Sequence, residues 1–153
     1  MERAQVIAAP SQLTPEQWER VQNALYPPYA RVDLEVDGYQ VSLRIRWAGA
    51  LKFQIVPLVN GKFKGEWLFK DCEERRRFAR PTTRALYSPA RVAQIIKNMG
   101  KRHGKRFADE HLSATITSYW YGWSSFGPLK RHLLKHNTSI RLVSIDGLGE
   151  PEL

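Results

Sequence analysis

A hairpin signal at Asp37-Gly38 constrains the fold of this chain more than any other feature. Apolar residues occupy every second position on both sides of it, which is the period of strands buried on one face. The Asp-Gly pair favours a two-residue type I′ turn, because both positions of that turn require a positive φ. Such a turn fixes the register, so six side chains should share one face. The predicted cross-strand pairs are Val32 with Leu43, Leu34 with Val41, and Val36 with Tyr39.

The alternation continues and predicts an antiparallel β-meander of about four strands over residues 30–69. The second strand should end at a turn at residues 48–50, and the third should cover residues 52–59. Asn60-Gly61 is another type I′ signal, after which a fourth strand is predicted over residues 62–69. Pro57 cannot donate to a ladder, so the third strand is expected to carry a bulge or to lie at an interrupted edge.

Helical patterns on both sides of the meander predict an α+β fold, with three or four helices packed on the sheet. The first helix begins at the capping signature of residues 14–17 and should run to about Leu25. A short helix is expected from Asp71, as its N-cap, to Phe78. The remaining predicted elements are helices over residues 88–101 or beyond and 124–137, and additional strands over residues 114–123 and 139–145.

The chain has 153 residues, a length that suits a single domain over 1–153, with loose termini at 1–12 and 146–153. Its 42% hydrophobic residues can bury enough apolar surface for one core. No apolar run reaches the roughly 20 residues that cross a bilayer, and the first residues show no signal-peptide core. The single cysteine, Cys72, agrees with a reducing compartment. We therefore expect a cytoplasmic protein without membrane contact.

Positive charge is the main functional signal. The net charge is +9, and residues 70–106 account for all of it, with twelve Lys and Arg against three acidic residues. Phosphate binding benefits from such density, since each neutralised phosphate releases counterions. In the alternative, Glu73 and Glu74 pair with nearby arginines on a solvated helix face. The residues predicted to bind nucleic acid or an anionic partner are Arg75, Arg76, Arg77, Arg80, Arg84, Lys97, Lys101, Arg102, Lys105 and Arg106, with Lys130 and Arg131 on a later helix.

An aromatic cluster lies close in sequence to Lys130 and Arg131. Aromatic rings beside basic residues suit single-stranded nucleic acid, because bases stack on the rings while the backbone meets positive charge. The alternative is that these rings fill the core. The predicted aromatic contact residues are Tyr119, Trp120 and Trp123.

No motif points to catalysis, a metal or a cofactor. His132 and His136 are four residues apart on a predicted helix, but no Glu completes the zinc-protease pattern, and we predict no metal site. The sequence has no GxSxG elbow, no Walker loop and no GxGxxG after a strand. A small metal-dependent nuclease would need convergent carboxylates that the sequence does not assemble. We therefore expect a non-enzymatic protein without a cofactor.

A resemblance rests on three segments, KGEWLFKDCEERRRFAR (residues 64–80), LYSP (residues 86–89) and LKRHLLKHNTSIRLV (residues 129–143). They resemble small accessory proteins of tailed bacteriophages and prophages of proteobacteria. That group has no established activity, so the resemblance implies no site residues. It implies a bacterial cytoplasm, with nucleic acid or host machinery as the partner.

Charge and resemblance together predict a basic accessory protein that binds DNA or RNA through its Arg/Lys-rich helical region. The alternative is an inhibitor or adaptor that binds a host defence protein, of the anti-CRISPR kind, through the same basic face. The oligomeric state is left open.

Overall fold

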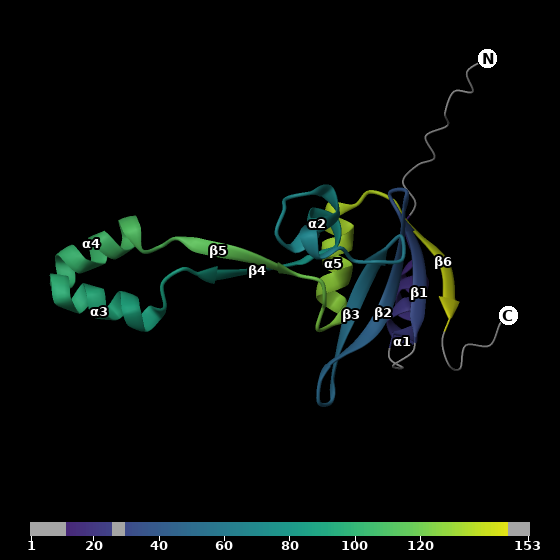
Figure 1. The fold of residues 1–153 in the computed structure, drawn as a ribbon, viewed down its shortest axis with the longest axis horizontal. Helices are drawn as coiled ribbons and strands as arrows, with labels where there is room; N and C mark the ends of the chain where they lie inside the picture. Colours follow the sequence, from purple (N-terminus) through teal and green to yellow (C-terminus); the bar gives the residue numbers. More distant parts are fainter. Residues whose placement is uncertain (1–11, 26–29, 147–153) are drawn as a thin grey trace, which may run out of the picture. The chain divides into compact units, whose positions relative to one another are not determined.

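The computed structural model describes residues 12–25 and 30–146, and its contacts divide the chain into two compact units (Figure 1). The sheet unit comprises Met1–Arg80 and Trp120–Leu153, and the ribbon unit comprises Pro81–Tyr119. The loose termini predicted at 1–12 and 146–153 fall almost wholly outside the described residues. The single domain over residues 1–153 stays a prediction.

A four-stranded antiparallel sheet organises the sheet unit and confirms the α+β class with its β-meander. The first hairpin has the predicted register, with Val32 opposite Leu43 and Leu34 opposite Val41. Asp37 and Gly38 have φ values of 46° and 87°, as a type I′ turn requires. The strands lie in the order β3-β2-β1-β6, with bounds β1 (Arg31–Val36), β2 (Tyr39–Gly49), β3 (Lys52–Val59) and β6 (Ile140–Asp146).

The strand predicted over residues 62–69 is wrong, and β6 is the fourth strand of the sheet instead. After the turn at Asn60 the chain pairs only once, through Lys62 and Val59. It then forms the 3₁₀ helix η1 (Gly65–Leu68), which buries Trp67 and leaves Phe69 85% exposed. A strand is disfavoured here because glycine, at position 65, weakens a strand interior. The helical turn is favoured because it buries the side chain of Trp67.

Pro57 fits its strand because β3 is an edge of the sheet, which confirms one of the two predicted explanations. The N–H groups two residues before and after it, at Ile55 and Val59, point away from β2 and bond to the carbonyls of Trp123 and Lys62, each at 2.8 Å. The nitrogen of Pro57 therefore falls on the outer side of the strand, where no ladder bond is lost.

The described part of the sheet unit contains, besides η1, the α-helices α1 (Pro15–Ala24), α2 (Glu73–Phe78) and α5 (Phe126–His136). The capping box predicted for α1 is present, since Thr14 and Gln17 exchange side-chain hydrogen bonds with each other's backbone N–H. Asp71 does not cap α2. The N-cap residue is Cys72, and the Asp71 carboxylate instead accepts a hydrogen bond from Arg76 at 3.0 Å.

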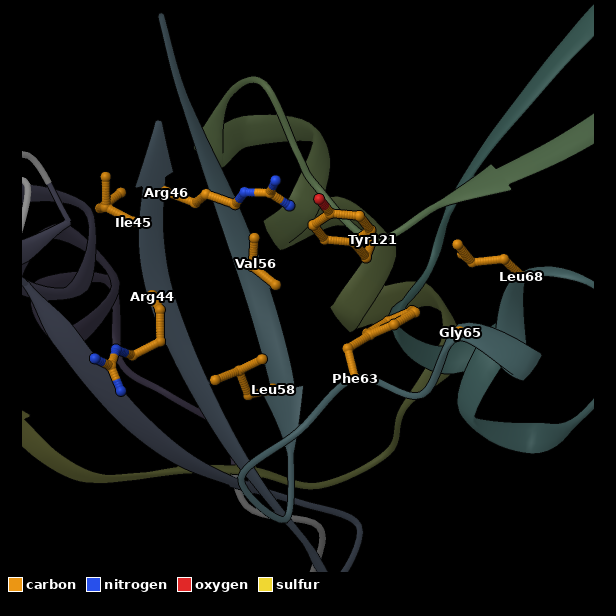
Figure 2. A pocket seen from close by; sticks show the side chains of 9 residues that line it. All are labelled: Arg44, Ile45, Arg46, Val56, Leu58, Phe63, Gly65, Leu68 and Tyr121. Atoms are coloured by element: carbon orange, nitrogen blue, oxygen red, sulfur yellow. The ribbon is translucent and has the colours of Figure 1, made fainter. Parts of the chain in front are cut away.

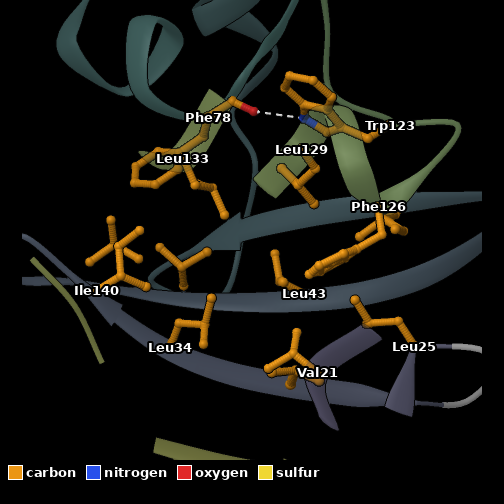
Figure 3. Close-up of a cluster of buried hydrophobic side chains, with 14 of the residues drawn as sticks. Val21, Leu25, Leu34, Leu43, Phe78, Trp123, Phe126, Leu129, Leu133 and Ile140 are labelled. Carbon is orange, nitrogen blue, oxygen red and sulfur yellow. Dashed lines mark hydrogen bonds between the residues drawn. The ribbon is translucent and has the colours of Figure 1, made fainter. Parts of the chain in front are cut away.

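One hydrophobic core lies between the sheet and these helices (Figure 3). Val21 of α1, Leu34 and Leu43 of the first hairpin, and Leu129 of α5 are all fully buried in it. Figure 3 shows the sheet residues between Val21 on one side and Leu129 and Leu133 on the other. The predicted face of the hairpin is therefore the face that packs in the core.

The side chain of Asp37 connects the first turn to residues 138–139, directly before β6, through hydrogen bonds. Its carboxylate accepts hydrogen bonds from the backbone N–H groups of Thr138 and Ser139, at 2.8 and 2.7 Å, and from Arg77 at 2.6 Å. Burial acts to raise the pKa of Asp37, but these three donors outweigh it, so that the pKa lies below its ordinary value. Arg77 continues the network to Asn137 at 2.8 Å and to Glu73 at 2.6 Å.

The ribbon unit consists of a two-stranded sheet and a pair of helices. The strands are β4 (Arg80–Ala85) and β5 (Thr115–Trp120), and the helices are α3 (Pro89–Met99) and α4 (Lys101–His111). The strand β4 was not predicted from the sequence. β5 confirms the strand expected within residues 114–123.

The helix predicted from Ser88 is present as α3, which ends at Met99, but its continuation beyond residue 101 is wrong, because the chain breaks at Gly100 and begins a second helix, α4. Ser88 does cap α3 by accepting a hydrogen bond from the Arg91 N–H, as expected. Gly100 has a φ of 85°, which ends the first helix at a residue that tolerates it. The two helices approach closely at Gly104, where a Cβ atom would lie 2.5 Å from the Cα of Ile96.

Candidate nucleic-acid interface

The basic residues predicted to bind an anionic partner fall into two sets, one in each unit. Since each unit is a separate compact body, the two sets are considered separately. The sheet-unit set is Arg75, Arg76, Arg77, Arg80, Lys130 and Arg131, and the ribbon-unit set is Arg84, Lys97, Lys101, Arg102, Lys105 and Arg106.

Most residues of the sheet-unit set make ion pairs, hydrogen bonds or ring contacts within the fold. Arg77 binds Asp37 and Glu73; burial acts to lower its pKa, but these two carboxylates raise it above the ordinary value. Arg76 bonds to Asp71, and Arg80 donates its Nε–H to the carbonyl of Gly122 at 2.9 Å. Lys130 lies 5.2 Å above the ring of Trp18. The alternative of a paired helix face therefore holds for Arg77 with Glu73.

The ribbon-unit set is different, because its charges have few carboxylates to meet. The 39 residues of this unit contain seven Lys and Arg, counting Arg91, and only two acidic residues, Asp109 and Glu110. All seven basic side chains are exposed. Within residues 81–119, all of which are described, the only Lys or Arg in an ion pair is Arg106, with its Nε 3.8 Å from Glu110. The unit therefore carries an excess of five positive charges.

The helix α4 concentrates this charge. Arg102 and Arg106 are one turn apart and so lie on one face of it. Lys101 and Lys105 lie beside a ribbon groove of about 410 Å³ between α3 and α4. Apolar side chains of both helices form much of that groove's lining, namely Val92, Ile96, Ala108 and Leu112.

Only one of the three predicted aromatic contact residues is largely exposed. Trp120 is 42% exposed, whereas Tyr119 is half-buried. Trp123 is 3% exposed and donates its indole N–H to the carbonyl of Phe78 at 3.1 Å, a bond drawn in Figure 3. The structure therefore corrects the expectation for Trp123, whose ring belongs to the core.

The rings of the two histidines on α5 lie against each other with their planes tilted by 40°. His132 and His136 have ring centroids 4.2 Å apart, and a ring nitrogen of His132 lies 2.9 Å from the carbonyl of Arg76. Within the described residues, no group of three His, Cys, Asp or Glu side chains could hold a metal ion. The same part of the chain contains no helix long and apolar enough to cross a membrane.

His132 should make the protein less stable at mildly acidic pH. Burial, with a smaller contribution from His136, lowers its pKa to about 4, so protonation in the folded state is disfavoured. The unfolded chain binds this proton at about pH 6.5, and stability is therefore full above that pH and lost as the pH falls toward 4. We expect the free energy of unfolding to drop by about 1 kcal/mol between about pH 7 and pH 5, with allowance for solvent screening.

Urea unfolding at both pH values measures this drop, and His132→Gln serves as the comparison. The variant should lose much of the pH dependence in this interval, because carboxylates such as Asp37 titrate mainly at lower pH. An unchanged pH dependence in His132→Gln would contradict the assignment to this ring.

The fold and its unpaired surface charge define a basic α+β protein with a distinct basic ribbon unit. Comparisons with protein-family models, with curated proteins and with solved structures find no match to this chain.

Proposed function

We propose that this chain is a non-enzymatic nucleic-acid-binding protein whose ribbon unit contacts the phosphate backbone of DNA or RNA. The observation that carries the proposal is the excess of positive charge in Pro81–Tyr119, where six of seven basic side chains have no carboxylate partner within the unit. Phosphates would supply the missing counter-charges, and release of their counterions would drive binding.

The distribution of charge between the units supports this assignment. In the sheet unit, arginines such as Arg77 are already neutralised by carboxylates that belong to the fold. A phosphate could replace such a carboxylate only if the fold lost the contact. In the ribbon unit no such exchange is needed, because Arg102 and its neighbours are exposed to solvent. Contacts to the phosphate backbone do not depend on the base sequence of the nucleic acid, which suits a protein that coats or scans it.

The cellular setting belongs to the same proposal. The resemblance to accessory proteins of tailed bacteriophages and prophages favours a role in the cytoplasm of a bacterial host. Nucleic acid is abundant there, and the positive excess of the ribbon unit would steer the protein toward it.

Titration of labelled duplex DNA, single-stranded DNA and RNA with the full chain tests the proposal, with fluorescence anisotropy as the readout. We expect binding at low salt that weakens steeply as salt rises. The labelled strands should stay intact after incubation with Mg²⁺, whereas cleavage would favour the nuclease alternative. Failure to bind any of the three at low salt would overturn the proposal.

A protein-binding inhibitor or adaptor of host defence is the second candidate function. It is favoured by the ribbon groove, in which the apolar side chains of Val92, Ile96 and Leu112 are flanked by Lys101 and Lys105. An acidic protein surface with apolar anchors would complement that arrangement. Purification from bacterial cells after nuclease treatment separates the candidates. A stoichiometric protein partner would favour the adaptor, and recovery of nucleic acid alone without nuclease would favour the first function.

A further inference from the structure

A second groove, which we call the sheet groove, lies on the face of β2 and β3 that points away from the core (Figure 2). Its volume is about 530 Å³, within the range of ligand sites. Val56 and Leu58 lie along β3, and Figure 2 shows Phe63 and Tyr121 beside them. The groove exists because strand residues alternate: the neighbours of Val56, Ile55 and Pro57, are buried on the other face.

Two aromatic rings, Phe63 and Tyr121, line this groove, and each of them contacts one further ring outside the lining. Tyr121 lies with its ring centroid 5.9 Å from Phe63 and 4.4 Å from Trp120, and Phe63 lies 4.9 Å from Trp67. Trp67 is buried, Phe63 and Tyr121 are each partly buried, and Trp120 is 42% exposed. Rings held in this way offer flat apolar surfaces at little further cost in side-chain entropy.

Among the described residues that line the groove, two arginines supply the only formal charges. Arg44 and Arg46 lie on the same face of β2, and no ion pair within the described residues involves either of them. The Arg46 guanidinium carbon lies 4.9 Å from the centre of the Tyr121 ring, and Figure 2 shows the side chain pointing toward that ring. The sheet groove therefore combines an apolar slot for a flat group with positive charge for an anion.

We propose that the sheet groove binds an unpaired nucleotide of single-stranded nucleic acid. The base would lie against Tyr121 and Phe63, and the phosphates would meet Arg44 and Arg46. Single strands supply a flat ring and a phosphate at every repeat, which matches both parts of the groove. A duplex keeps its bases stacked inside and offers only its phosphates. This inference rests on the proposed function and specifies its substrate.

Paired measurements on single-stranded and duplex DNA of equal length test the inference, with anisotropy of the labelled DNA as the readout. The test variants are Tyr121→Ala and the exposed pair Arg44→Gln with Arg46→Gln, which should leave folding intact. The control is Trp47→Ala with Phe53→Ala, because these rings contact each other at 4.1 Å, are exposed and lie outside the groove. Loss of one stacking ring should weaken single-strand binding by about 5- to 150-fold.

Duplex binding should change little in Tyr121→Ala, and the control should bind single strands as the unmodified chain does. A single strand that carries a photoreactive halogenated uracil should cross-link to Tyr121 or Phe63. Single-strand binding by both groove variants at full strength, or cross-links only elsewhere, would overturn the groove assignment and leave the proposed function standing. Binding of a free mononucleotide as tightly as of the single strand would also overturn the assignment of the groove to single-stranded nucleic acid. Absence of all nucleic-acid binding by the unmodified chain is the distinct result that removes the proposed function.

Discussion

Asp37→Ala is expected to lower the free energy of unfolding by about 2 to 4 kcal/mol. The change removes the carboxylate that accepts hydrogen bonds from the backbone N–H groups of Thr138 and Ser139. It also removes the ion pair between that carboxylate and the half-buried Arg77. It also puts alanine at a φ of 46°, a conformation that Asp tolerates better. Urea unfolding followed by tryptophan fluorescence measures the loss, since Trp18, Trp67 and Trp123 are buried.

Asp37→Asn is the matched control for this change. Asparagine keeps the shape, one carbonyl acceptor and the tolerance of positive φ, but it loses the charge that binds Arg77. Its loss of stability should therefore be smaller than that of Asp37→Ala. A loss below about 1 kcal/mol in Asp37→Ala would show that the turn and the segment before β6 are held by apolar packing instead.

Removal of four charges from α4 should have the largest effect on nucleic-acid binding. The variant replaces four exposed residues with glutamine, namely Lys101, Arg102, Lys105 and Arg106. Counterion release contributes a factor of about eight per phosphate contact at about 0.1 M salt. If two to four of these residues contact phosphate, affinity should fall by about 60- to 4000-fold. Anisotropy titration of labelled duplex DNA measures this loss.

A matched control removes the same number of charges from the sheet unit. Lys52, Lys62, Lys70 and Lys135 are exposed there, and their change to glutamine alters the net charge equally. The control should weaken binding much less than the α4 variant. Equal weakening by both would mean that binding follows net charge and not the ribbon unit.

The local turn chemistry explains why the first hairpin could be predicted residue by residue. Asp37-Gly38 permits one turn type, that turn fixes the pairing, and the alternation of apolar residues agrees with it. The capped start of α1 was predictable for a similar reason, since Thr14 and Gln17 satisfy each other's backbone within one turn.

Long-range pairing was not predictable in the same way. β6 pairs with β1 although the two strands are far apart in the sequence, at Arg31–Val36 and Ile140–Asp146, and no turn joins them. The strand expected over residues 62–69 had a good turn signal before it, but burial of Trp67 in a helical turn outweighed that signal. The break at Gly100 was not predicted, and the close packing of Gly104 on Ile96 that accompanies it appears only in the structure.

The candidate site shows the same limit. Sequence identified the basic residues but could not tell Arg77, which pairs with two carboxylates, from Arg102, which has no ion-pair partner in its unit. It grouped Trp123 with the surface aromatics, although its indole reaches a backbone carbonyl in the core. Tyr121 belongs to the aromatic cluster found in the sequence but was not selected as a contact residue. Its neighbour Phe63 was missed because the two rings are far apart in sequence and meet only in the folded chain.

The salt dependence of binding tests whether the ribbon unit makes the phosphate contacts. The slope of log affinity against log salt counts the phosphate contacts, at about 0.9 per contact on duplex DNA. We expect this slope to become shallower by about 2 to 4 in the variant that lacks the charges of Lys101, Arg102, Lys105 and Arg106, and by much less in the sheet-unit control. Equal slopes for the unmodified chain and the α4 variant would contradict the assignment of phosphate binding to the ribbon unit.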